Sequence, residues 1–180
     1  MQEVTLIIGL PGSGKSTLIE YYKSHPFIDY KVYDDWMACT FDKIKIKEFN
    51  SECRYKELIQ NLDSYNHSII TCVNFCNNEF LHKSEYYLKL KFPNIKIDRI
   101  YFENDFKKCK SNIEYRDKQR GGYWEPNEKG EMWYYGEIYV PNGVNKGPLY
   151  KHEIKNSYEL SQNYIIPEGY PVFPIMVQEE

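Results

Sequence analysis

A glycine-rich segment near the amino terminus, GLPGSGKST at Gly9–Thr17, constrains the fold more than any other part of the chain. It follows an apolar, β-branched run, Val4–Ile8, and it precedes residues 15–25, which contain no glycine or proline and favour a helix. The segment fits the pattern G-x-x-x-x-G-K-S/T, in which a buried strand leads through a glycine-rich loop into a helix. We therefore expect a strand, a tight turn and a helix in that order.

Each part of this loop suits a bound polyphosphate. Glycines adopt backbone angles closed to other residues and let main-chain amides approach an anion, which the dipole of the following helix also favours. Lys15 can reach the β- and γ-phosphates of a nucleoside triphosphate, and the Ser16 hydroxyl can ligate Mg²⁺. We predict a nucleoside triphosphate site formed by Gly9, Pro11, Gly12, Ser13, Gly14, Lys15, Ser16 and Thr17.

The chain alternates strand-like and helix-like segments as far as residue 122. Strands are expected at 3–9, 30–35, 67–75 and 95–103, and helices at 15–25, 46–62, 77–92 and 104–122. This alternation predicts an α/β fold of three layers, with a mostly parallel sheet between helices. Ligands bind beyond the carboxyl ends of such strands, so the glycine-rich loop, the acidic pair Asp34–Asp35 and Asn74 should meet in one cleft.

Two carboxylates and two arginines are candidates for phosphoryl transfer. Asp34 can act as the base that accepts a proton from a hydroxyl acceptor, while Asp35 supports Mg²⁺. At about 100° per residue, Arg116 and Arg120 fall within about 80° of the apolar stripe on the same helix. Arginines on that face can neutralise charge on the transferred group. A simple acidic turn, and arginines that complement a helix dipole, are the alternative interpretations.

In order along the chain, GLPGSGKST, DDW, IITCVNF and an R-x-x-x-R pair before two glycines resemble a known family. They are similar to the P-loop kinases of the phage-type polynucleotide kinase group and its small zeta-toxin-like, AAA-type relatives. The resemblance covers roughly residues 1–122 and implies a P-loop NTPase fold, ATP, Mg²⁺ and transfer of the γ-phosphoryl group to a hydroxyl. By position, it implies that Asp34 is the general base and that Arg116 and Arg120 are lid arginines.

Two positions depart from that family pattern. Cys72 stands where the family commonly has an aspartate at the end of the third strand, so Mg²⁺ would rely on Ser16, water and Asp35. Met37 stands where polynucleotide kinases of this type carry an arginine that grips a substrate phosphate. The acceptor is therefore left open among a polynucleotide 5′-hydroxyl, a nucleoside and another small hydroxyl compound. A non-catalytic or regulatory ATP-binding module of a larger assembly is the alternative function.

Residues 123–180 differ in amino-acid composition from the predicted kinase core of residues 1–122. They are rich in aromatic residues, glycine, proline and asparagine, and residues 131–150 suggest a β-hairpin packed on the core. The interleaved tyrosines, tryptophans and lysines also raise the possibility of a platform for single-stranded nucleic acid. The net charge of −3 favours the hairpin interpretation over this one.

The compartment is expected to be cytoplasmic. The five cysteines are odd in number and form no C-x-x-C pair, which argues against a disulfide framework. The amino-terminal apolar run is shorter than the apolar region of a signal peptide, and no stretch approaches a membrane span. We expect no membrane partner.

Overall fold

The computed structural model describes residues 2–24, 30–33, 62, 64–119, 123–126, 132–140, 143–148 and 150–178. These residues form an α/β fold around a five-stranded sheet of order β2-β3-β1-β4-β8, in which every pairing is parallel. The strands are β1 (Glu3–Ile8), β2 (Tyr30–Tyr33), β3 (His67–Thr71), β4 (Lys96–Phe102) and β8 (Val172–Phe173). The expected α/β class and parallel sheet are confirmed.

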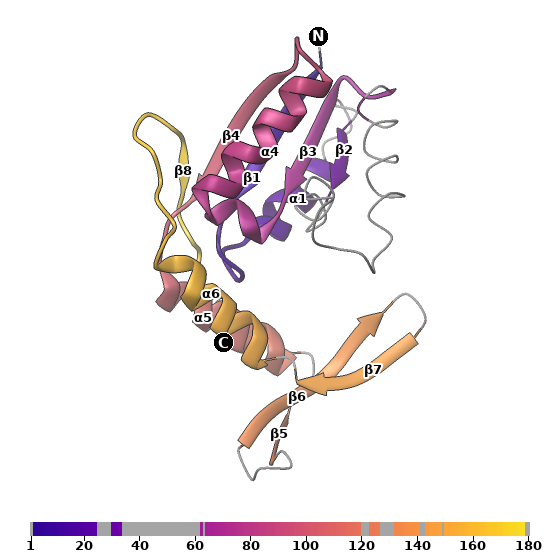
Figure 1. The fold of residues 1–180 in the computed structure, drawn as a ribbon. Helices are drawn as coiled ribbons and strands as arrows, with labels where there is room; N and C mark the ends of the chain where they lie inside the picture. The colour runs from indigo at the N-terminus through magenta and orange to yellow at the C-terminus, as the bar shows by residue number, and fades with distance from the viewer. Residues whose placement is uncertain are drawn as a thin grey trace.

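Four α-helices surround this sheet in the described part of the chain. They are α1 (Lys15–Lys23), α4 (Asn78–Lys91), α5 (Phe106–Gln119) and α6 (Tyr150–Ser161). Helices α1 and α4 lie on opposite faces of the sheet, and α5 and α6 pack together beyond the carboxyl ends of its strands (Figure 1). Among these helices, none combines the length and the apolar character needed to cross a bilayer.

Strand β1 lies at the centre of the core. It pairs with β3 on one side and β4 on the other, and Val4, Leu6, Ile7 and Ile8 are fully buried. A continuous apolar run is what a strand covered on both faces requires, because neither face of its side chains reaches water. The run that precedes the glycine-rich loop is therefore the central strand of the sheet.

The third strand is shorter than the sequence predicts. Strand β3 ends at Thr71, which pairs with Ile7, and a 3₁₀ turn, η1 (Val73–Cys76), follows it. On this side the neighbouring strand β1 ends at Ile8, where the chain leaves the sheet for the loop. In this parallel register Ile8 faces Cys72, so residues beyond Cys72 have no β1 residue to pair with, and the chain turns. It enters α4 through Asn77, whose side chain caps the helix by accepting a hydrogen bond from the Phe80 amide at 3.2 Å.

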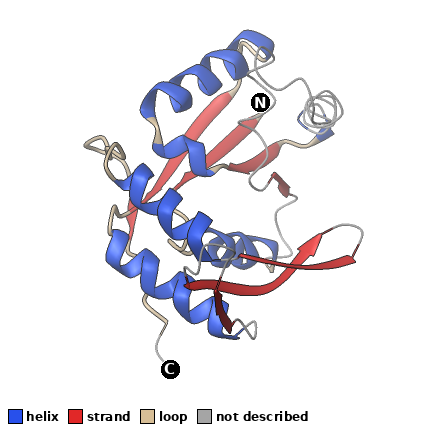
Figure 2. Cartoon of the chain, turned by 60° about the horizontal axis from the view of Figure 1, so that its bottom comes forward, coloured by secondary structure: helices blue, strands red, loops and turns tan. Residues whose placement is uncertain are grey.

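A second, antiparallel sheet follows α5 in the chain. It consists of β5 (Tyr123–Pro126), β6 (Met132–Val140) and β7 (Gly143–Pro148), in the order β5-β6-β7. The β6–β7 pair is the hairpin expected from the sequence. Figure 2 shows this sheet beside the α5–α6 pair, away from the parallel sheet.

Residues after 150 share one core with the amino-terminal residues, which differs from the expected division at residue 122. Helix α6 packs on α5, and β8 extends the parallel sheet by pairing with β4. The buried Tyr164 hydroxyl lies 2.6 Å from the Phe102 carbonyl oxygen and 3.2 Å from that of Ile8, so it links the ends of β4 and β1. Neither α6 nor β8 was expected from the sequence.

Candidate functional site

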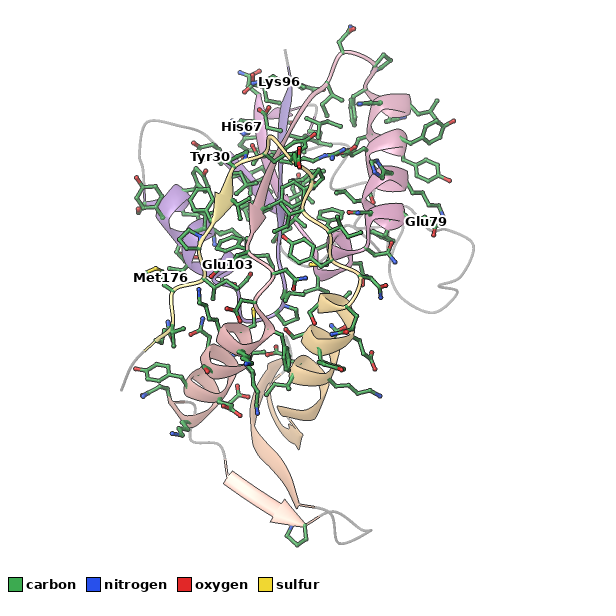
Figure 3. The ribbon with its side chains drawn as sticks, turned by 90° about the vertical axis from the view of Figure 1, so that its left-hand side faces the viewer. Tyr30, His67, Glu79, Lys96, Glu103 and Met176 are labelled. Atoms are coloured by element: carbon green, nitrogen blue, oxygen red, sulfur yellow. The ribbon has the colours of Figure 1, made fainter. Side chains whose placement is uncertain are left out.

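A pocket of about 800 Å³ lies at the carboxyl edge of the parallel sheet. Its described lining comes from the glycine-rich loop, α1, η1, the end of β4, α5, α6 and the segment after β8. In Figure 3, Tyr30, His67 and Lys96 lie near the amino ends of the strands, and Glu103 and Met176 lie toward the other edge. The volume is within the range of about 300–1,000 Å³ typical of small-molecule sites. The loop predicted to bind phosphate therefore lines a pocket large enough for a small ligand.

The shape of the loop depends on two glycines for different reasons. Gly12 and Gly14 have φ values of +81° and +98°, in the left-handed region that favours glycine. A Cβ at Gly12 would also lie 2.4 Å from the Cys109 carbonyl oxygen of α5. Gly14 is the N-cap residue of α1 and provides no side-chain cap. No side chain of the N-cap residue therefore occupies the first-turn amides of α1. An anion site requires such amides to be available to the ligand.

Lys15 places a buried positive charge beside this loop. Its side chain donates hydrogen bonds to the carbonyl oxygens of Gly9 and Leu10, both at 2.9 Å, and the residue is only 8% exposed. No carboxylate pairs with it among the described residues. The nearby thiols of Cys76 and Cys109 supply no counter-charge, because burial raises the pKa of each to about 12. Since a buried charge without a counter-charge is costly, the site favours an anionic ligand.

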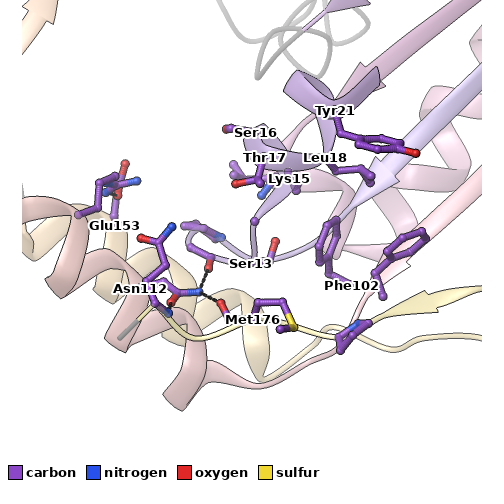
Figure 4. A pocket seen from close by; sticks show the side chains of 18 of the residues that line it. Ser13, Lys15, Ser16, Thr17, Leu18, Tyr21, Phe102, Asn112, Glu153 and Met176 are labelled. Carbon is purple, nitrogen blue, oxygen red and sulfur yellow. Dashed lines mark hydrogen bonds and ion pairs between the residues drawn. The ribbon is translucent and has the colours of Figure 1, made fainter. Parts of the chain in front are cut away.

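A second cation, Arg116 of α5, lies in the pocket wall opposite α1. It forms an ion pair with Glu153 of α6 and lies 3.3 Å from the buried carboxylate of Asp117. Burial acts to lower the pKa of Arg116, but the bond to Glu153 and the charges of both carboxylates outweigh it, so the pKa is raised. The guanidinium is therefore charged, and Glu153 holds it at the pocket wall. Figure 4 shows Glu153 across the pocket from Ser16 and Thr17.

The pocket has a polar part and an apolar part. The loop residues from Ser13 to Thr17, together with Arg116 and Glu153, form the polar part. The apolar part is formed by Leu18, Tyr21, Phe102, Phe173, Pro174 and Met176, and Pro11 and Val73 also line the pocket. Four of these side chains, those of Tyr21, Phe173, Pro174 and Met176, are at least one-third exposed, so they present apolar surface to an incoming ligand.

The structure brings together most of the predicted site residues that it describes. Pro11 to Thr17 and Arg116 line one pocket, and Gly9 lies beneath them, where a Cβ would be 2.6 Å from the Ser13 hydroxyl. Asn74 is exposed in η1, and its neighbour Val73 reaches the pocket instead. Asp34, Asp35 and Arg120 lie outside the described residues.

Sequence reasoning missed the contributions of α6 and of the segment after β8. Glu153 and Asn156 line the pocket from α6, and Asn112 lines it from α5. A signal for Asn112 was present, because it lies three residues after Cys109 and four before Arg116, on the same helix face. The α6 residues carry no comparable signal, because that helix itself was not expected.

The described residues contain no cluster of three or more His, Cys, Asp or Glu side chains placed to hold a metal ion. Of the predicted Mg²⁺ ligands, Ser16 lies in the pocket. No known protein-family model matches the chain, and no curated protein matches its sequence. The resemblance to P-loop kinases therefore stays a prediction.

Proposed function

We propose that the protein is an ATP-dependent kinase with a P-loop NTPase fold, which transfers the γ-phosphoryl group to a hydroxyl acceptor. One observation carries the proposal. The buried Lys15 ammonium lies at the start of α1 with two carbonyl oxygens as partners and no carboxylate among the described residues. A polyphosphate supplies the negative charge that this arrangement lacks.

The two parts of the pocket suit the two parts of a nucleotide. The loop amides, Lys15 and Thr17 would hold the phosphates, and the apolar lining would hold the nucleoside. Arg116 would neutralise charge on the transferred group, together with Arg120. Ser16 would hold Mg²⁺ with Asp35, and the ion would offset negative charge on the phosphate oxygens. Asp34 would accept the proton of the acceptor hydroxyl.

The test is a titration followed by a transfer assay. Calorimetry with MgATP should show binding, and inorganic tripolyphosphate should compete, because both present phosphates to the loop. Labelled ATP should then transfer its γ-phosphoryl group to one member of a panel of 5′-hydroxyl oligonucleotides, nucleosides and small alcohols. Asp34→Asn should lower that transfer by about 100-fold while MgATP binding is retained. Absence of MgATP binding by the wild type would refute the proposal.

The alternative, a regulatory ATP-binding module, has one structural observation in its favour. Cys72, which stands in the position of the family's aspartate, is 2% exposed, and no acidic side chain occupies that position at the end of β3. A module would bind MgATP, lose that binding in Lys15→Ala, and transfer phosphate to no acceptor of the panel. The same two assays thus separate the two functions.

Glu153→Gln should tighten the binding of polyphosphate. The Glu153 carboxylate holds Arg116 and faces the same pocket, so it competes with an anionic ligand for the guanidinium. We expect the affinity for inorganic tripolyphosphate to rise by about fivefold in Glu153→Gln. Glu159→Gln is the matched control, because Glu159 lies exposed on the same helix and pairs with Lys155. Equal affinities in wild type and Glu153→Gln would show that Glu153 does not compete with the ligand.

A further inference from the structure

Strand β8 and the segment that follows it form one edge of the pocket, and we call residues 172–178 the C-terminal arm. Its first part is tied to the sheet. Phe173 accepts a hydrogen bond from the Glu103 amide at 2.9 Å, and the Ile175 amide donates to the Glu103 carboxylate at 2.8 Å. Phe173, Pro174 and Met176 belong to the apolar lining of the pocket.

Among the described residues, one side chain forms hydrogen bonds with the backbone of the arm beyond Ile175, that of Asn112 on α5. The Asn112 amide nitrogen donates to the Met176 carbonyl oxygen at 2.9 Å, and its carbonyl oxygen accepts from the Gln178 amide at 2.9 Å. The two bonds fix the arm on either side of Val177. Met176 and Val177 are 76% and 43% exposed, so this part of the arm is not held by burial of its side chains.

The same Asn112 nitrogen also donates to the carbonyl oxygen of Gly12 at 3.0 Å. One amide group therefore joins three segments that are far apart in the sequence: the glycine-rich loop, α5 and the C-terminal arm (Figure 4). Gly12 also packs closely on α5, since a Cβ there would lie 2.4 Å from the Cys109 carbonyl oxygen. Asn112 thus connects the loop, in the polar part of the pocket, to the arm, in its apolar part.

We propose that Asn112 is a positioning residue that holds the C-terminal arm against the nucleoside part of a ligand whose phosphates lie in the loop. This inference rests on the proposed nucleotide site. It assigns Asn112 no contact with a phosphate. Loss of the side chain should therefore weaken binding of a ligand that has a nucleoside, and should spare one that consists of phosphates alone.

The experiment compares two ligands in two variants. Asn112→Leu keeps the side-chain shape and removes all three hydrogen bonds. We expect the Kd for MgATP to rise by about tenfold and the Kd for inorganic tripolyphosphate by less than about twofold. Asn104→Leu is the matched control, because the Asn104 amide also donates two hydrogen bonds to backbone carbonyls, those of Ser161 and Tyr164, away from the arm. It should lower stability without changing the ratio of the two Kd values.

Each outcome decides the matter. If both Kd values rise equally in Asn112→Leu, or neither changes, the inference is wrong. If the wild type binds neither ligand, or binds MgATP without competition by tripolyphosphate, the proposed phosphate site fails first, and this inference fails with it. Should Asn112→Leu not fold, Asn112→Asp tests the same point, because it keeps the acceptor for Gln178 and removes the donor to Gly12 and Met176. Its ratio of Kd values should rise relative to that of Asn104→Asp.

Discussion

Lys15→Ala should lower phosphoryl transfer by about 100- to 1,000-fold, the loss typical when a group that stabilises charge in a transition state is removed. The reason is the position of the Lys15 ammonium, which is buried beside the loop and held by the carbonyl oxygens of Gly9 and Leu10. A polyphosphate in the loop would exchange those neutral partners for charged ones. Transfer of labelled phosphate from ATP measures the effect, and calorimetry shows how much of it comes from nucleotide binding.

The free energy of unfolding of the Lys15→Ala variant shows whether a loss of activity comes from loss of the site or from unfolding of the protein. Burial of an ammonium group is unfavourable, so its removal should change the free energy of unfolding by no more than about 1 kcal/mol. Lys23→Ala is the control on the same helix, since Lys23 is half-exposed at the end of α1 and pairs with Glu20. Nearly normal transfer by Lys15→Ala, at any stability, would remove the basis of the proposed function.

Gly12→Ala should destabilise the fold by about 3–5 kcal/mol, through two costs that act together. A Cβ at this position would lie 2.4 Å from the Cys109 carbonyl oxygen and 2.9 Å from the Ile113 side chain. The first contact is with the backbone of α5, which cannot move aside as a flexible side chain can. The residue would also keep its φ of +81°, which is unfavourable for alanine. Urea denaturation measures the loss.

Gly169→Ala separates the two costs. Gly169 has a φ of +85°, close to that of Gly12, but a Cβ there would meet no heavy atom within 4 Å. It should therefore show only the backbone cost, about 1–2 kcal/mol. Equal losses of stability in Gly12→Ala and Gly169→Ala would mean that the close contact between the loop and α5 does not contribute to the cost of Gly12→Ala.

The parts of the fold that the sequence predicts well are those with local causes. The apolar run of β1, the glycines of the loop and the start of α1 are adjacent in the chain, so each supports the interpretation of the next. The capping role of Asn77 and the end of α4 before Pro93 are local in the same way. Arg116 was expected near the loop because it shares a helix face with the apolar stripe of α5, and it does line the same pocket as Lys15.

The parts that the sequence did not predict have causes far away in the chain. Strand β8 has two residues, too few for any periodic pattern, and it forms because β4 offers a free edge. Glu153 becomes part of the pocket only because α6 packs on α5. The hydrogen bonds of Asn112 require residues 12, 112 and 176 to lie close together in space. No local sequence pattern predicts contacts between residues so far apart in the chain.

The hydroxyl of Tyr164 has a mechanical consequence. It reaches the carbonyl oxygens at which β1 and β4 end, so a residue contributed late in the chain adds a cross-link to two strands that already pair. We therefore expect the ends of β1 and β4 to open less readily than the helices around the pocket and the backbone beyond Ile175. Addition of MgATP should accordingly leave hydrogen exchange in β1 and β4 unchanged and alter it in α5, α6 and the backbone beyond Ile175.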